Sequence, residues 1–195
     1  MISFQDLKKF KNNIAVASST GKKYTYGLLI DYIKLINKNL QPRSIVLFLA
    51  KNSIGSLVGY ISFLLNKTVP IMIDNNLDQQ LLYNLINKYK PKYVWIPSEE
   101  NFILNKAELK LDILGYRLFE LSLNRRNLIY NNLGLLLPTS GSTGSPKLVR
   151  LSYKNILSNA NSIVDFLSIN EKERPITSLP MHYSFGLSII NSHLI

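Results

Sequence analysis

The sequence has no cysteine and only two histidines, His182 and His193, among its 195 residues. Without cysteine there are no disulfide bonds or thiolate metal sites, and two histidines are too few for a histidine-rich metal cluster. No apolar run reaches the ~20 residues needed to cross a bilayer. The N-terminus, MISFQDLKKFKNN, becomes polar and charged too early for a signal peptide. We therefore expect a cytoplasmic protein with no membrane span.

Acidic residues are also scarce: 12 Asp and Glu stand against 23 Lys and Arg, which gives a formal net charge of +11. A basic chain can bind nucleic acid or an anionic membrane surface. The basic residues are scattered, however, and no RNA-binding, zinc-finger or basic-zipper pattern accompanies them. A solvated basic surface is the favoured interpretation, and we expect no nucleic-acid partner. Strongly salt-dependent binding to DNA or RNA would revive the alternative.

Hydrophobic residues make up 46% of the chain, enough for a substantial core. Apolar β-branched runs alternate with segments of helical period, a rhythm typical of a parallel sheet with right-handed crossovers. The sequence thus predicts an α/β fold: a largely parallel, doubly wound sheet with helices on both faces and no internal domain boundary. Strands are expected at 44–50, 68–74, 92–97, 116–123, 133–140 and 176–181. Helices are expected at 23–40, 54–65, 77–89, from the Ser152 cap to 167, and at 185–195. Residues 98–112 are expected to be irregular or briefly helical.

Residues 139–147, TSGSTGSPK, form what we call the signature segment. Its glycines allow backbone N–H groups to converge on an anion, its hydroxyls can donate to phosphate or help to ligate Mg²⁺, and Lys147 adds a mobile positive charge. Apolar residues before it and a helix-like run after it predict a strand–loop–helix phosphate site. The segment lacks the residue order of a Walker loop, a dinucleotide-binding fingerprint or a nucleophile elbow.

The signature segment resembles that of the adenylate-forming superfamily, which includes acyl-CoA synthetases, luciferases and peptide-synthetase adenylation domains. KYTYGLL, the block VLFLAKNSIGSLVGYISFLLNKTVPIMID, and LPMHYSFGLS are similar to further family segments. The resemblance implies the N-terminal subdomain of the adenylate-forming fold, an AMP-binding ligase class, and ATP with Mg²⁺. It also implies a set of nucleotide-binding residues: Thr139, Ser140, Gly141, Ser142, Thr143, Gly144 and Lys147.

The LPMHYSFGLS segment implies an acyl-side group made of Tyr183, Phe185 and Gly186, for which plain core packing is the alternative. The family motif often has histidine where Tyr183 stands, and here His182 comes one residue earlier. We expect His182 to be a hydrogen-bonded loop histidine. No residue is assigned as catalytic, and no separate metal site is assigned.

The resemblance places a later nucleotide-binding region and a C-terminal lid after Ile195. We therefore expect residues 1–195 to be a single partial domain, the N-terminal portion of an AMP-binding domain, with the lid absent. The implied reaction activates a carboxylic acid as its acyl-adenylate and then transfers the acyl group to CoA or a carrier-protein pantetheine. The alternative is a non-catalytic module that binds a nucleotide or a protein. An acyl-carrier protein is an expected partner, and the truncated surface is expected to support a homodimer.

Overall fold

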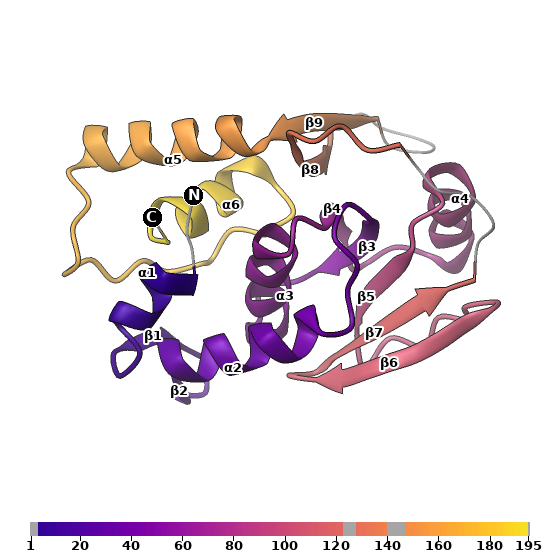
Figure 1. Cartoon of the computed structure of the whole chain (residues 1–195), viewed down its shortest axis with the longest axis horizontal. Coiled ribbons are helices and arrows are strands. Elements are labelled where there is room, and N and C mark those ends of the chain that lie inside the picture. The colour runs from indigo at the N-terminus through magenta and orange to yellow at the C-terminus, as the bar shows by residue number, and fades with distance from the viewer. Residues whose placement is uncertain (1–3, 123–127, 140–146, 195) are drawn as a thin grey trace.

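The computed structural model describes residues 4–122, 128–139 and 147–194 of the chain. A seven-stranded sheet lies at the centre, and a small two-stranded sheet lies beside the first two helices (Figure 1). The strands are β1 (Ile14–Ala17), β2 (Lys23–Thr25), β3 (Ile45–Ala50), β4 (Val69–Asp74), β5 (Tyr93–Pro97), β6 (Ala107–Ile113), β7 (Tyr116–Leu121), β8 (Leu133–Pro138) and β9 (Leu148–Ser152). The helices are α1 (Phe4–Lys9), α2 (Tyr26–Asn37), α3 (Ile54–Leu65), α4 (Gln79–Tyr89), α5 (Tyr153–Leu167) and α6 (Ser184–Ser192).

The large sheet has the strand order β6-β7-β5-β3-β4-β8-β9. Its four central strands, β5, β3, β4 and β8, are parallel, and β3 pairs with β4 along its whole length, from Ile45↔Val69 to Ala50↔Asp74. Strands β7, β6 and β9 add antiparallel edges. The predicted largely parallel, doubly wound sheet is therefore confirmed at its centre, and both antiparallel edges extend it.

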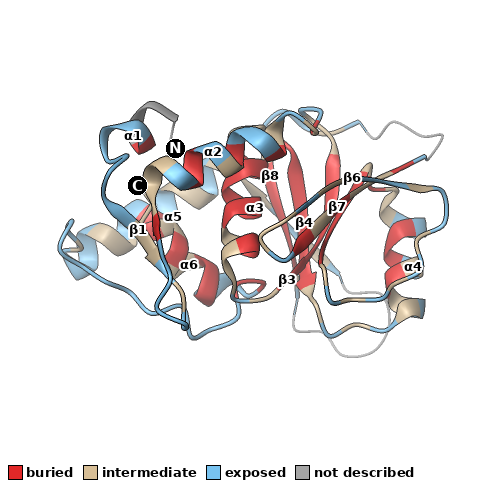
Figure 2. Cartoon of the chain, turned by 90° about the horizontal axis from the view of Figure 1, so that it is seen from below, coloured by how far each residue is buried: buried red, intermediate tan, exposed pale blue. Residues whose placement is uncertain are grey.

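Two hydrophobic cores lie on opposite faces of this sheet. On one face the core includes buried residues of α2, α3 and α6, and on the other face it includes those of α4. Figure 2 shows α4 on one side of the buried strands and the other large helices on the opposite side. All six residues of β3 are buried, as expected for a strand that is covered on both faces. Within the described part of the chain, no helix is long and apolar enough to cross a bilayer.

Helix α3 lies close to the sheet because two of its residues are glycines. A Cβ atom on Gly59 would lie 2.5 Å from Nε1 of Trp95, and one on Gly55 would lie 2.5 Å from Cδ2 of Tyr116. The Trp95 indole donates a hydrogen bond to the Gly55 carbonyl at 3.2 Å and stacks on the Tyr116 ring at 5.2 Å between centroids. The glycines therefore leave room for an aromatic layer that joins α3 to β5 and β7.

The structure corrects four of the expected elements. Residues 98–112 contain most of β6, whose half-exposed edge position gives it a weak hydrophobic pattern. Residues 23–25 form β2 before α2 begins, and α6 ends before the expected residue 195. Residues 176–181 form no strand. The Ser152 cap of α5 is confirmed, since its hydroxyl accepts from the Asn155 amide in a capping box.

Candidate functional site at the carboxyl edge of the sheet

The carboxyl ends of β3 and β4 lie side by side, with Ala50 opposite Asp74. The chain leaves β3 for α3, in one helix layer, and leaves β4 for α4, in the other. Neighbouring strands whose connections diverge in this way form a topological switch point, where ligands bind in open α/β sheets. Strand β8 lies next to β4, so the signature segment follows the neighbouring parallel strand.

The two ends of the signature segment are held together. The Thr139 N–H donates to the Lys147 carbonyl at 2.9 Å, next to the β8–β9 pair Pro138↔Leu148, and both side chains are exposed. The other nucleotide-binding residues of the prediction, Ser140, Gly141, Ser142, Thr143 and Gly144, lie outside the described residues. Thr139 and Lys147 thus lie next to each other at the carboxyl edge of β8.

The predicted strand–loop–helix arrangement around this segment is wrong in one respect. Lys147 leads directly into β9, and α5 begins only at Tyr153. The apolar residues after Lys147 pair antiparallel with β8 and do not start the helix. The N-terminal dipole of α5 is therefore separated from the segment by a whole strand and does not adjoin it.

The side chain of Asn52, immediately after β3, holds the chain that precedes α6. Its amide nitrogen donates to the carbonyls of Thr177 and, at 2.9 Å, Leu179, and its amide oxygen accepts from the Met181 N–H at 3.0 Å. Residues 176–181 are attached here by a side chain, which explains why the predicted strand is absent. This attachment brings the LPMHYSFGLS segment, residues 179–188, to the switch point; we call this segment the second motif.

His182 lies at the end of this attached segment, and it is only 4% exposed. Its Nε2 is 3.7 Å from Oδ2 of Asp74, and neither ring nitrogen makes a hydrogen bond of ordinary geometry. His182 is a loop histidine, as predicted, and the Ala50 backbone is the hydrogen-bonding group that faces its ring. Burial lowers the pKa of His182 below its ordinary value, although the Asp74 carboxylate and the Ala50 backbone act in the opposite direction. Burial therefore favours the neutral form of the ring.

The predicted acyl-side residues divide into two kinds. Tyr183 and Phe185 are 51% and 68% exposed, so plain core packing does not describe them. Gly186 is buried, and a Cβ atom there would lie 2.4 Å from the Pro180 carbonyl oxygen. Its lack of a side chain lets α6 approach the 179–180 backbone, and the exposed Tyr183 ring lies 4.2 Å from the His182 ring between centroids.

A buried hydrogen-bond network supports the loop that carries Asn52. The Tyr116 hydroxyl lies 2.6 Å from the Ser56 hydroxyl and donates to the Leu49 carbonyl at 3.0 Å, and the Lys51 N–H lies within 3.3 Å of both hydroxyl oxygens. Burial raises the pKa of Tyr116 to about 12, so the phenol stays protonated.

Asn52, Asp74 and Tyr116 were absent from the sequence prediction. The positions of Asn52 and Asp74, at the carboxyl ends of two buried strands, are the signal that could have found them.

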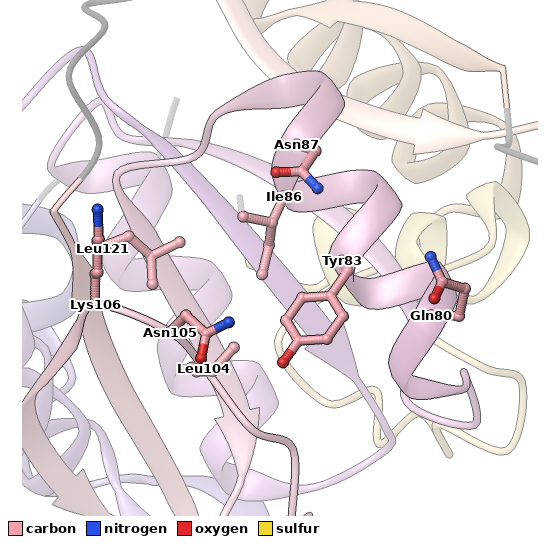
Figure 3. Close-up of a pocket in the computed structure, with 8 residues that line it drawn as sticks. All are labelled: Gln80, Tyr83, Ile86, Asn87, Leu104, Asn105, Lys106 and Leu121. Carbon is pink, nitrogen blue, oxygen red and sulfur yellow. The ribbon is translucent and has the colours of Figure 1, made fainter.

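A separate cavity of about 370 Å³ lies beside α4, and neither Thr139 nor Lys147 is among its lining residues (Figure 3). Its walls are mainly apolar, and none of the buried, unpartnered polar atoms of the described residues belongs to it. We assign it no role. Its lining residues are Gln80, Tyr83, Ile86, Asn87, Leu104, Asn105, Lys106 and Leu121. Nowhere in the described ranges do three or more His, Asp or Glu side chains gather as a metal-binding group.

The fold and the site define an α/β protein in which the two ends of the signature segment and residues 177–182 lie at the carboxyl edge of one parallel sheet. Comparison with known proteins is more specific. Residues 4–195 match the model of the AMP-binding enzyme family, and the chain belongs to that family. The recognition of an adenylate-forming, acyl-CoA synthetase-like chain from its motifs is thereby confirmed.

Individual relatives are distant. The chain is 24% identical over 185 residues to a D-alanine–D-alanyl carrier protein ligase of Staphylococcus aureus, covering 91% of this chain and 36% of that protein. It resembles the structure of o-succinylbenzoate coenzyme A synthetase from Bacillus subtilis in complex with AMP, with a TM-score of 0.73 and 17% identity, over 97% of this chain and 52% of that one. It also resembles apo MatB from Rhodopseudomonas palustris, with a TM-score of 0.74 and 20% identity, over 94% and 40%. The chain thus spans about a third of the length of the curated relatives it matches.

Proposed function

We propose that this chain provides the ATP-binding part of an enzyme that activates a carboxylic acid as its acyl-adenylate. The observation that carries the proposal is the placement of Thr139 and Lys147, hydrogen-bonded to each other and exposed, at the carboxyl edge beside the switch point. Family membership supports the same reaction class. A structural relative of this chain was solved with ATP and a magnesium ion, which supports ATP–Mg²⁺ as the nucleotide.

In the proposed reaction, a carboxylate oxygen attacks the α-phosphorus of ATP. A new bond forms between that oxygen and phosphorus, and the bond from phosphorus to the bridging oxygen breaks, so that pyrophosphate leaves. The barrier comes largely from repulsion between the carboxylate and the triphosphate, which positioned donors reduce. Lys147, Thr139 and the rest of the signature segment would hold the β- and γ-phosphates. Mg²⁺ would enter with ATP as its phosphate complex.

We further propose a thiol as the acceptor in a second step. Its sulfur attacks the acyl carbonyl, the thiol proton is lost, and AMP leaves. The names of two relatives support two versions of this step, a carrier-protein ligase and a coenzyme A synthetase. Tyr183, Phe185 and Gly186 would line the acyl side. The proposed location is the cytoplasm, where ATP is abundant.

ATP binding by the 195-residue chain tests the proposal most directly. We expect ATP–Mg²⁺ to bind, and Lys147→Ala to weaken binding by about tenfold to a hundredfold, because a charged hydrogen bond contributes about 1.5–3 kcal/mol. Lys154→Ala, an exposed lysine on α5, is the matched control and should bind as the unmodified chain does. Titration calorimetry measures all three. Equal affinity in all three proteins would remove the signature segment from the site.

Pyrophosphate exchange separates the enzyme from the binding module. We propose that the 195-residue chain is the N-terminal portion of an AMP-binding domain and shows little exchange alone. In a longer protein that contains it, exchange should depend on a carboxylic acid and on Lys147. Acid-independent ATP binding without exchange in that longer protein would favour the non-catalytic module.

We also propose self-association as a homodimer through the surface around α5 and α6. Of the described residues of α5 only Ala160 is fully buried, and Phe166, Ile176 and Phe185 are 87%, 80% and 68% exposed. Exposed apolar surface of this kind favours association, and the net charge of +11 opposes larger aggregates. Sedimentation over a wide concentration range should show a dimer. A strict monomer at high concentration would contradict the proposal.

A further inference from the structure

Asn52 joins parts of the chain that are 125 to 129 residues apart in sequence. The amide nitrogen faces two backbone carbonyls, of Thr177 and Leu179, and the amide oxygen faces the Met181 N–H. This arrangement determines the orientation of the amide, since the carbonyls need a donor and the N–H needs an acceptor. Aspartate would set a charged oxygen against two carbonyl oxygens, and leucine would offer no hydrogen bond. The position therefore requires both halves of a primary amide.

The loop around Asn52 is rigidly held on both sides. Before it, the Lys51 N–H is held by the buried Ser56 and Tyr116 hydroxyls. After it, Ser53 caps α3 by accepting from the Ser56 N–H at 3.2 Å. Because this loop is fixed to the sheet, the hydrogen bonds of Asn52 also fix residues 177–181 relative to the sheet.

The segment that Asn52 holds has no strand partner of its own, and residues 171–180 are all exposed. It runs directly into the part of the chain that faces the switch point. The Tyr183 N–H donates to the Pro180 carbonyl at 3.1 Å, and His182 lies against Asp74 at the end of β4. Asn52 after β3 and Asp74 at the end of β4 thus hold neighbouring points of this segment.

We propose that Asn52 is a positioning residue: it anchors residues 177–181 to the carboxyl edge and so determines where His182, Tyr183 and Phe185 lie. Its consequence for ligands rests on the proposed function. There, Asn52 sets the affinity for the acyl part of an acyl-adenylate and leaves the phosphate side, at Thr139 and Lys147, unchanged. Asn52 acts through the segment it holds, without contact to the reacting atoms.

Hydrogen–deuterium exchange on the 195-residue chain tests the anchoring. Asn52→Ala should accelerate exchange in peptides from 176–187 by about fivefold to tenfold for each hydrogen bond lost. Asn52→Asp keeps an acceptor for the Met181 N–H but loses both donors. At the Met181 amide it should therefore accelerate exchange less than Asn52→Ala does. If the alanine variant folds poorly, Asn52→Gln, which keeps both halves of the amide one methylene further out, is the second variant and should still accelerate these peptides. Exchange in β3, β4 and β5 should stay unchanged.

The control variant is Asn66→Ala, at the other end of α3, where the amide donates locally to Thr68. It should leave the 176–187 peptides as they are in the unmodified chain. Unchanged exchange of those peptides in Asn52→Ala, or equal acceleration in Asn66→Ala, would overturn the anchoring role.

Ligand binding tests the second half of the proposal with two probes, ATP–Mg²⁺ and the non-hydrolysable mimic 5′-O-(N-octanoylsulfamoyl)adenosine. Asn52→Ala should weaken the acyl probe at least about fivefold more than ATP, since only the acyl side is displaced. Equal weakening of both probes, or of neither, would overturn the positioning role in binding. If the unmodified chain binds neither probe, the proposed function fails, and the exchange experiment still decides the anchoring.

Discussion

Replacing Gly186 with alanine should displace the backbone on which the second motif depends. A Cβ atom at this position would lie 2.4 Å from the Pro180 carbonyl oxygen, 2.7 Å from the Leu179 carbonyl oxygen and 2.9 Å from the Pro180 carbonyl carbon. Ordinary contacts of a Cβ atom begin at 3.4 Å, and all three obstacles are backbone atoms, which cannot turn away as a side chain can. Either α6 or the 179–180 backbone must therefore move.

Two opposing effects set the size of the change. Alanine is favoured over glycine inside a helix by about 0.5–1 kcal/mol. Overpacking a close contact costs about 1–3 kcal/mol, and here the displaced Leu179 carbonyl is also an acceptor for Asn52. We expect the overpacking to dominate, with a net loss of about 1–2 kcal/mol in the free energy of unfolding.

Urea unfolding followed by tryptophan fluorescence measures this loss, because Trp95 is the single tryptophan and is fully buried. The transition midpoint should fall while the slope stays constant. Ser184→Ala, at an exposed position in the same helix, is the control and should stay within about 0.5 kcal/mol of the unmodified chain. A Gly186→Ala chain as stable as the control, or more stable, would refute the close approach of α6 to the 179–180 backbone.

Two further predictions concern buried polar groups. The pKa of His182 is lowered in the folded chain, so the unfolded chain takes up the proton first as pH falls below its ordinary value of about 6.5, and stability should fall from there downwards. The urea midpoints at pH 7.5 and 5.5 measure this effect, and the difference between the two midpoints should be smaller in His182→Gln than in the unmodified chain. An equal difference in both proteins would assign the pH dependence to other groups. Tyr116→Phe should lower the free energy of unfolding by about 1–3 kcal/mol, because it leaves the Leu49 carbonyl and the Ser56 hydroxyl without their buried partner. Calorimetric unfolding should show this loss and no comparable loss in Tyr130→Phe, an exposed control; equal values would mean that the hydroxyl network is not stabilising.

The sequence by itself was sufficient for the features that depend on neighbouring residues. The run at 45–50 is apolar at every position, and the structure buries all of it as β3. The helical spacing between 54 and 65 produces α3, and Ser152 caps α5 as its place before a periodic run predicts. The family resemblance of the signature segment was also readable, since it depends on residue order alone, and the match over residues 4–195 confirms it.

The edge strands of the sheet, β6 and β9, could be identified only from the tertiary structure. Strand β6 alternates between exposed and half-buried residues, and it becomes a strand because β7 turns back beside it through Leu114 and Gly115 at positive φ. The residues after Lys147 have the apolar content of a helix start, yet pairing with β8 makes them β9. In both cases the partner strand supplies the hydrogen bonds that decide the conformation, and local propensity does not contain that information.

The composition of the site was decided by contacts between distant residues. Asn52 meets Thr177, and His182 meets Asp74, across more than a hundred residues of sequence. An asparagine after a strand and a histidine in a loop look like ordinary polar residues until the sheet brings the ends of β3 and β4 together. The local sequence pattern determined the strands and helices. The parallel pairing of those strands determined which polar side chains share one edge of the sheet. The sequence pattern does not contain this information, because side-chain hydrogen bonds and burial depend on position in space and have no period along the chain.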